Sequence, residues 1–221
     1  MDISGKKIGV VMTGSFCTFS KVIPKIKELV NQGAKVIPIM SFNGYSLDTK
    51  FGKADDFINQ VEQITGNKVI STIQDAEPIG PKKMTDVMIV VPCSGNTIAK
   101  LANNIIDTPA TMAVKSHLRN ENPVVIAIST NDGLSGSAEN IGKLLNRRNY
   151  YFVPFKQDNP ITKPRSLVFD ESYVVKTLEE ALSKKQIEPI LLWIWIKNLT
   201  KNCNNDGANR LNIWQINTYG V

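Results

Sequence analysis

Clusters of small polar residues with the potential to hold a ligand follow four apolar runs of this chain. The clearest cluster is Pro92–Thr97, which stands between the apolar run Val87–Val91 and a segment with helical spacing. Hydroxyl and amide groups beside a helix N-terminus can bind a phosphate or orient a polar ligand, because the first N–H groups of a helix have no partner within it. The other three clusters are Thr13–Ser15, Ser41 with Asn43, and Ser129–Gly133.

Residues for acid–base or nucleophilic chemistry are few. We expect the one histidine, His117, at the surface or at an interface rather than in an active site. Cys17 and Cys93 stand near predicted helix N-termini, which lower the pKa of a thiol, but packing beside a cofactor is the more ordinary use of a small residue. Lys100 is either a cationic neighbour of the Pro92–Thr97 cluster or a solvated helix residue. The GxGxxG, GxxxxGK[ST] and GxSxG motifs are all missing from the sequence.

An alternation of apolar runs with amphipathic segments is expected to position these clusters. Strands are predicted at 7–12, 35–40, 68–73, 86–91, 123–128 and 150–153, and helices at about 22–33, 54–64, 98–105, 109–119, 138–146 and 172–183. Segments 41–52 and 77–81 are expected to be loops, and the fourth strand to stop at Pro92, which has no N–H to donate. The pattern predicts an α/β fold of Rossmann-like or flavodoxin-like type, with three αβα layers and a parallel sheet. Such sheets bind ligands at the carboxyl ends of their strands, where the four clusters lie.

The charge, the cysteine content and the apolar segments of the sequence argue against several classes of ligand and partner. A net charge of +6 with scattered basic residues favours an anionic small molecule over nucleic acid, for which we find no motif. Three cysteines without a CxxC pair argue against a zinc site and a disulfide framework, so we expect no bound metal. The N-terminus has no signal-peptide core and the run 190–196 is too short to span a bilayer, so we expect no membrane partner.

The last segment of the chain differs from the rest. All three tryptophans lie after residue 192, many asparagines accompany them, and no helical or strand period runs through 202–221. The segment is either an arm that packs on a neighbouring subunit or an extraneous tail, and the abrupt change in composition favours the tail. We therefore expect a single domain over 1–192 and an atypical tail over 193–221.

Several stretches carry a resemblance to known families. Pro92–Ala102 resembles the PASANT motif of the flavin-containing cysteine decarboxylases and flavin prenyltransferases, and Thr13–Ser15 resembles their first FMN loop. Closer similarity, to the family of dipicolinate synthase B subunits, extends from Gly5 to about Leu192. It is carried by segments 49–54, 64–70, 76–83, 128–133 and 151–155.

This resemblance implies an FMN site built from the four clusters. It implies cofactor contacts for Thr13, Gly14, Ser15, Ser41, Asn43, Pro92, Cys93, Ser94, Gly95 and Thr97. It implies that Asn96 and Asn131 are the catalytic-site amides that face a substrate carboxylate. The FMN phosphate is expected near Gly14, held by Ser15 and Ser41, with the flavin ring against Pro92–Thr97.

The resemblance also implies a biological role. Such a protein would act with the A subunit, which carries NAD(P), to oxidise a dihydrodipicolinate-type intermediate to dipicolinic acid during sporulation. Its place would be the cytoplasm of the mother cell, and its assembly a homo-oligomer, a trimer or larger. Two alternatives stay open: a non-catalytic scaffold that completes the A-subunit site, and an FMN-dependent decarboxylase. The decarboxylase alternative is weakened because segment 71–86 lacks the histidine that precedes the motif in those enzymes.

Overall fold

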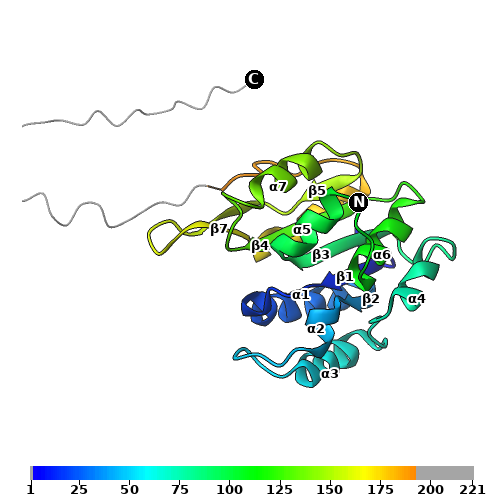
Figure 1. The fold of residues 1–221 in the computed structure, drawn as a ribbon. Coiled ribbons are helices and arrows are strands. Elements are labelled where there is room, and N and C mark those ends of the chain that lie inside the picture. The colour runs from blue at the N-terminus through cyan, green and yellow to red at the C-terminus, as the bar shows by residue number, and fades with distance from the viewer. Residues whose placement is uncertain (1, 193–221) are drawn as a thin grey trace, which may run out of the picture.

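The computed structural model describes residues 2–192, which form a sheet between two layers of helices (Figure 1). Five strands are parallel and lie in the spatial order β2-β1-β3-β4-β5. They are β1 Lys7–Met12, β2 Lys35–Met40, β3 Val87–Cys93, β4 Val124–Thr130 and β5 Tyr150–Phe152. This is the strand order of a flavodoxin-like fold, whose ligand crevice lies between β1 and β3. The predicted fold class is confirmed.

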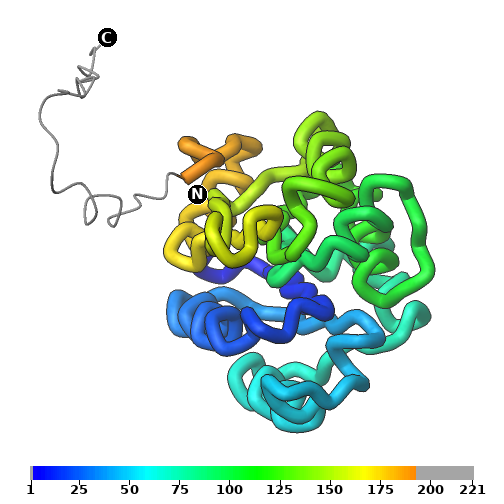
Figure 2. Tube along the Cα trace, turned by 60° about the vertical axis from the view of Figure 1, so that its left-hand side comes forward, coloured from blue at the N-terminus to red at the C-terminus, as the bar shows by residue number. Residues whose placement is uncertain are grey.

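The helices divide between the two faces of the sheet. The α-helices are α1 Phe19–Asn31, α2 Phe42–Ser46, α3 Ala54–Thr65, α4 Ile73–Ala76, α5 Gly95–Ala102, α6 Pro109–Leu118, α7 Ala138–Leu145 and α8 Val174–Leu182. Three 3₁₀ turns adjoin single helices: η1 Phe16–Thr18 precedes α1, η2 Glu77–Ile79 follows α4, and η3 Glu171–Tyr173 precedes α8. Apolar residues of α1, α3 and α8 pack with Val10 and Met12 on one face, and those of α5, α6 and α7 pack with Val11 on the other. Figure 2 shows the part from α1 to α3 (blue to cyan) lying below the part from α5 to α7 (green).

An antiparallel hairpin that the sequence patterns did not predict extends the sheet. Its strands are β6 Phe155–Asn159 and β7 Lys163–Phe169. Strand β7 joins β4 through the pairs Ser129↔Val168 and Thr130↔Leu167. This pairing extends β4 two residues beyond the predicted end at 128, so Ser129 and Thr130 belong to the sheet rather than to a loop.

The outer sides of the sheet carry isolated bridges rather than further strands. Ile70 pairs with Ile39 at the outer side of β2, where its N–H donates to the Pro38 carbonyl at 2.9 Å. Leu191 pairs in the same way with Phe155 of β6. The predicted strand at 68–73 is thus reduced to the single residue Ile70, because α4 begins at Ile73.

The prediction that the strand stops at Pro92 is wrong. Strand β3 continues through Pro92 to Cys93, and its register against β4 shifts between Val90 and Cys93. At such an irregularity a residue without an N–H is tolerated, since the ladder needs no donor there. The Pro92 carbonyl instead accepts a hydrogen bond of 2.7 Å from the Thr13 hydroxyl.

Segment 41–52, predicted as a loop, contains the short helix α2, which Ser41 caps through a 3.2 Å bond from the Gly44 N–H. The predicted cap of α6 at Thr108 is confirmed, with Pro109 as the first helical residue. The predicted tail at 193–221 lies outside the described residues. In the described part of the chain, no helix is both long enough and apolar enough to cross a bilayer.

His117 is buried, whereas the sequence predicted it at the surface or at an interface. It is 1% exposed on α6. Its Nε2 lies 3.0 Å from the Pro123 carbonyl, which can only accept, so Nε2 carries the proton and Nδ1 accepts from the Thr85 hydroxyl at 2.7 Å. The ring is therefore satisfied in its neutral form, and burial lowers the pKa of His117 to about 4.

This burial predicts a pH-dependent stability. The unfolded chain protonates His117 near its ordinary pKa of about 6.5, whereas the folded chain does so near 4. The contribution of the neutral ring to the free energy of unfolding is therefore fully present above a pH of about 6.5, and it is lost as the pH falls toward about 4. Between pH 7 and pH 5 the free energy of unfolding should fall by about 2 kcal/mol from this group alone. Urea unfolding of the wild type and of His117→Gln at both pH values measures it. Equal losses in the two proteins would contradict the assignment, and no second histidine confuses the comparison.

Candidate functional site

The carboxyl ends of β1, β2, β3 and β4 bring the four polar clusters together. Thr13, at the end of β1, joins two of them, because its hydroxyl donates to the Pro92 carbonyl at 2.7 Å and accepts from the Ser94 N–H at 3.0 Å. Thr13 is fully buried, so both bonds are shielded from water. The loops that follow β1 and β3 are thereby fixed to each other.

Helix α5 begins at this junction. Ser94 is its N-cap, with the side-chain oxygen accepting from the Thr97 N–H at 3.4 Å and lying 3.1 Å from the Thr97 hydroxyl. Gly95 is the first helical residue, and a Cβ there would lie 2.6 Å from the Thr130 hydroxyl and 2.8 Å from that of Ser137. Glycine therefore lets the positive end of α5 approach the loop after β4 closely.

A cavity of about 340 Å³, which we call the polar cavity, opens on one side of this junction. Its lining consists mainly of hydrogen-bonding groups: Gly14, Ser41, Phe42, Asn43, Ser94, Asn96, Thr97, Lys100, Asp107 and Thr108. Lys100 and Asp107 form an ion pair in which Nζ lies 2.7 Å from both carboxylate oxygens. The pair leaves the lining without net charge, so the donors that remain for an anion are hydroxyls, amides and the N-terminus of α5.

A second cavity of about 340 Å³, the aromatic cavity, lies on the other side. It is lined by Gly14, Ser15, Phe16, Cys17, Phe51, Ser94, Gly95, Ser129, Thr130, Asn131 and Asp132. The two phenylalanine rings of this lining, Phe16 and Phe51, suit a planar ligand. Gly14 and Ser94 line both cavities, so the two adjoin at these residues.

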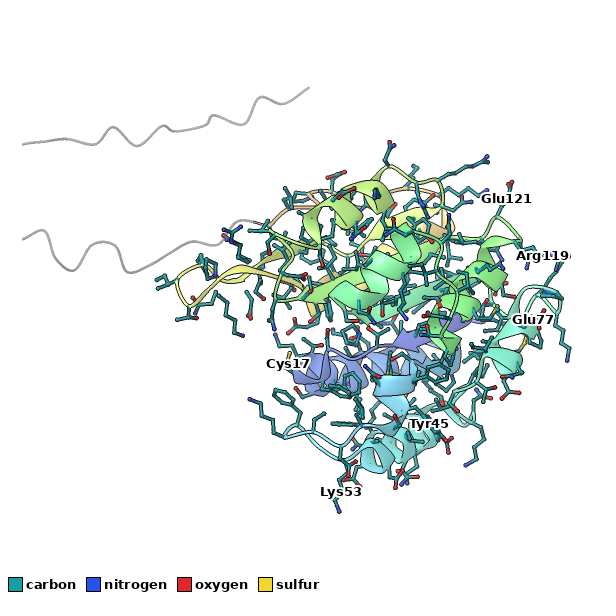
Figure 3. The ribbon with its side chains drawn as sticks, in the orientation of Figure 1. Cys17, Tyr45, Lys53, Glu77, Arg119 and Glu121 are labelled. Atoms are coloured by element: carbon teal, nitrogen blue, oxygen red, sulfur yellow. The ribbon has the colours of Figure 1, made fainter. Side chains whose placement is uncertain are left out.

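The floor of the aromatic cavity is a hydrogen-bonded group around Asp132. Its Oδ1 accepts from the hydroxyls of Thr130 and Ser137, the latter at 2.8 Å. Ser15, from the loop after β1, donates its hydroxyl to the Ser129 carbonyl at 2.6 Å. In Figure 3, Cys17 marks this side of the molecule, whereas Glu77 and Arg119, near the C-terminal end of α6, lie at the opposite edge. His117 belongs to that opposite end and cannot serve the site.

Most of the predicted site residues line one or both of the two cavities, but three of them line neither. Ser41, Asn43, Asn96 and Thr97 line the polar cavity, Ser15, Gly95 and Asn131 line the aromatic cavity, and Gly14 and Ser94 line both. Thr13, Pro92 and Cys93 are buried behind the walls and line neither. Burial raises the pKa of the Cys93 thiol far above its ordinary range, so Cys93 packs as an apolar residue and is no nucleophile.

Two expected pairings are changed by this geometry. Ser15 and Ser41 were expected to hold one phosphate, but they line different cavities. Asn96 and Asn131 were expected to face one substrate, and they too lie in different cavities. A ligand that reaches both members of either pair must pass over Gly14 and Ser94.

Comparison with known proteins agrees with this architecture. Residues 1–172 match the flavoprotein family. The chain belongs to the flavoprotein family. Within this family, it is 44% identical over 191 residues to the B subunit of dipicolinate synthase from Bacillus subtilis (strain 168), covering 86% of this chain and 96% of that protein.

Two solved structures have folds similar to that of this chain. The crystal structure of the B subunit of dipicolinate synthase from Bacillus halodurans C superposes with a TM-score of 0.81 at 42% identity, covering 88% of this chain and all of that one. The FMN-dependent cysteine decarboxylase SpaF superposes with a TM-score of 0.62 at 20% identity, covering 81% and 98%, which shows a shared fold only. The resemblance to dipicolinate synthase B subunits is thus confirmed in sequence and in structure.

Sequence reasoning missed several residues of the site. Phe16, Phe51, Asp107 and Thr108 line the cavities without belonging to any polar cluster. Asp132 stood inside a recognised cluster, but its sequence context is that of an ordinary turn residue. Only the fold shows that its carboxylate is held by two hydroxyls at the cavity floor.

Proposed function

We propose that this chain is the FMN-binding subunit of a dipicolinate synthase. It would act with an NAD(P)-binding A subunit to oxidise a dihydrodipicolinate-type precursor to dipicolinic acid in the mother cell of a sporulating bacterium. The observation that carries the proposal is the pair of adjoining cavities, one rich in donors and one flanked by aromatic rings, in a chain 44% identical to a dipicolinate synthase component.

The chemistry of the lining fits FMN. Hydroxyls, amides and a helix N-terminus in the polar cavity suit a phosphate, and Ser41, Asn43 and Thr97 would hold it. The rings of Phe16 and Phe51 suit a planar heterocycle in the aromatic cavity. At Gly14, where the cavities adjoin, a ligand can approach the backbone because no side chain intervenes. Cavities of this size lie in the range of small-molecule sites.

Within this proposal the protein positions its ligands and excludes water. Bound FMN supplies two-electron acceptance, and that chemistry belongs to the cofactor. Asn96 and Asn131, one on each cavity, would each orient a different carboxylate of a substrate that lies over Gly14 and Ser94, where the cavities adjoin. A homo-oligomer of three or more copies, and association with the A subunit, belong to the same proposal.

Co-purification with the A subunit tests the proposal. The complex should absorb at about 450 nm, as flavins do, and Asn96→Asp should weaken dipicolinate binding about 10-fold or more, because it sets a carboxylate against a dianion. Asn59→Asp, an exposed change on α3, is the matched control and should bind as the wild type does. A complex that carries no flavin and keeps full activity with Asn96→Asp would overturn the proposal.

The scaffold alternative is favoured by one observation. The charged side chains of the polar cavity, Lys100 and Asp107, are already paired with each other. A scaffold predicts an active complex without flavin. The decarboxylase alternative predicts product from cysteinyl peptides without the A subunit, so the same preparation separates all three functions.

A further inference from the structure

We propose that Asp132 is the proton acceptor of the candidate site; this inference rests on the proposed function. Asp132 follows β4 closely and lies beside Asn131 on the lining of the aromatic cavity. It is the one carboxylate among the residues that line this cavity. Its place in the sequence suggested no role beyond that of a turn residue.

The two oxygens of the carboxylate have different surroundings. Oδ1 accepts hydrogen bonds from the Thr130 and Ser137 hydroxyls, and Ser137 is only 3% exposed, so this oxygen is fixed in place. Oδ2 receives no hydrogen bond from any residue within 2–192. A carboxylate can accept several hydrogen bonds, so Oδ2 is available for a proton while Oδ1 maintains the orientation. Such a division is what a positioned base requires.

The reaction needs a base of this kind. Aromatisation of a dihydropyridine dicarboxylate removes two hydrogens. One C–H bond would break with its electron pair leaving as hydride to a two-electron acceptor of the flavin or nicotinamide class. A second C–H or N–H bond breaks with its electron pair remaining in the ring, and its proton forms an O–H bond with Asp132 Oδ2. The proton then passes to solvent through the open cavity.

Other ionisable groups near the site are less suited to this role. Lys100 is bound to Asp107 in the polar cavity, and Cys93 is buried behind the wall. Cys17 also lines the aromatic cavity, but it is exposed on η1 and no hydrogen bond within residues 2–192 fixes its thiol. Four charged groups near these elements are engaged elsewhere. Arg165 of β7 donates to the Leu134 carbonyl at 3.3 Å, and Glu139 pairs with Lys143 on α7 at 2.8 Å. Lys163 of β7 pairs with Asp158 at 2.6 Å, and Lys50 lies over the Phe51 ring.

Asp132→Asn in the complex with the A subunit tests the proposal. The amide oxygen still accepts both hydroxyl bonds, so the thermal midpoint and the flavin affinity should stay near the wild-type values. Turnover should fall about 100-fold or more, the usual contribution of a general base. Asp158→Asn, which removes an exposed carboxylate on β6, is the matched control and should leave turnover unchanged.

Proton uptake gives a readout independent of turnover. Because the bound pyridine-2,6-dicarboxylate dianion would place negative charge beside the Asp132 carboxylate, its binding to the flavin-loaded complex should make Asp132 take up as much as one proton. Calorimetry in buffers of different ionisation enthalpy measures this uptake, which Asp132→Asn should abolish. If the variant turns over normally or still takes up the proton, the assignment of Asp132 is wrong and the proposed function stands. If the wild type binds neither flavin nor the dicarboxylate, both proposals are wrong.

Discussion

Gly80→Ala should destabilise the protein by about 3–5 kcal/mol, the sum of a severe overpacking penalty and a lost buried hydrogen bond. A Cβ on Gly80 would overlap the Ser116 carbonyl oxygen on α6 and lie 2.8 Å from the carbonyl carbon. The clash is with backbone, which cannot rotate away as a side-chain end could. The Gly80 N–H also donates to the Ser116 hydroxyl at 2.8 Å, a bond that separation of η2 from α6 would break. The backbone itself would accept alanine, since φ at Gly80 is −75°, so the effect is entirely one of space.

Gly142→Ala is the matched control for this prediction. Gly142 is exposed within α7, and a Cβ there would have no neighbour within 4 Å. The same chemical change should therefore stabilise the protein by about 0.5–1 kcal/mol through helix propensity. Urea unfolding followed by circular dichroism compares the two. A Gly80→Ala protein as stable as the wild type would contradict the close packing of η2 on α6.

Gly14→Glu should abolish flavin binding, with an affinity loss of about 100-fold or more, because it places bulk and a negative charge where the two cavities adjoin. Without a bound ligand, the folded protein has room for a side chain at position 14. A Cβ there would be 3.7 Å from the Asn43 Cβ and 3.9 Å from the Phe16 ring, both ordinary contacts. The free energy of unfolding should therefore change by less than about 1 kcal/mol, as for surface substitutions generally. Flavin titration by fluorescence quenching measures the affinity.

Gly142→Glu introduces the same residue on α7, outside the lining of both cavities, and should bind flavin normally. Gly14→Ala should have an intermediate effect, since it adds bulk without charge. Wild-type affinity in Gly14→Glu would mean that flavin binds elsewhere. Full turnover of the complex despite lost flavin would favour the scaffold function.

The sequence predicted the parts of this molecule that local physics determines. Buried apolar runs alternating with amphipathic segments sufficed for the five parallel strands and for the helix that begins after Thr108. The β6–β7 hairpin was not predicted, because Phe155–Asn159 is mostly polar and shows no clear alternation of apolar and polar residues. Its place is decided by pairing with the end of β4, which no local pattern encodes.

Tertiary partners explain the errors at single residues. His117 was expected at the surface or at an interface because its helix, 109–119, is remote from the predicted strand ends, and nothing in its local sequence indicates burial. Its partners, Thr85 and Pro123, come from other segments of the chain. At Pro92 the rule against proline in a central strand failed because the register shift removes the need for its N–H. For the site, the four clusters could be located by their strand ends, but the division into two cavities depends on side-chain directions that only the fold supplies.

The capped margins of the sheet have a consequence for assembly. On the side of β2, Pro38 lacks an N–H and Ile70 already occupies the neighbouring groups. On the side of β6, the strand is only five residues long, carries Lys156 and Asp158, and meets Leu191. The third margin, β5 Tyr150–Phe152, has only three residues, and the Gln186 side chain bonds both the N–H and the carbonyl of Phe152. Within residues 2–192 the sheet therefore offers no long unpaired strand for edge-to-edge growth, a device that natural proteins use against aggregation. We therefore expect a second copy or a different protein to associate with this part of the chain mainly through side chains, so that the specificity of assembly would reside in surface residues that mutation can change one at a time.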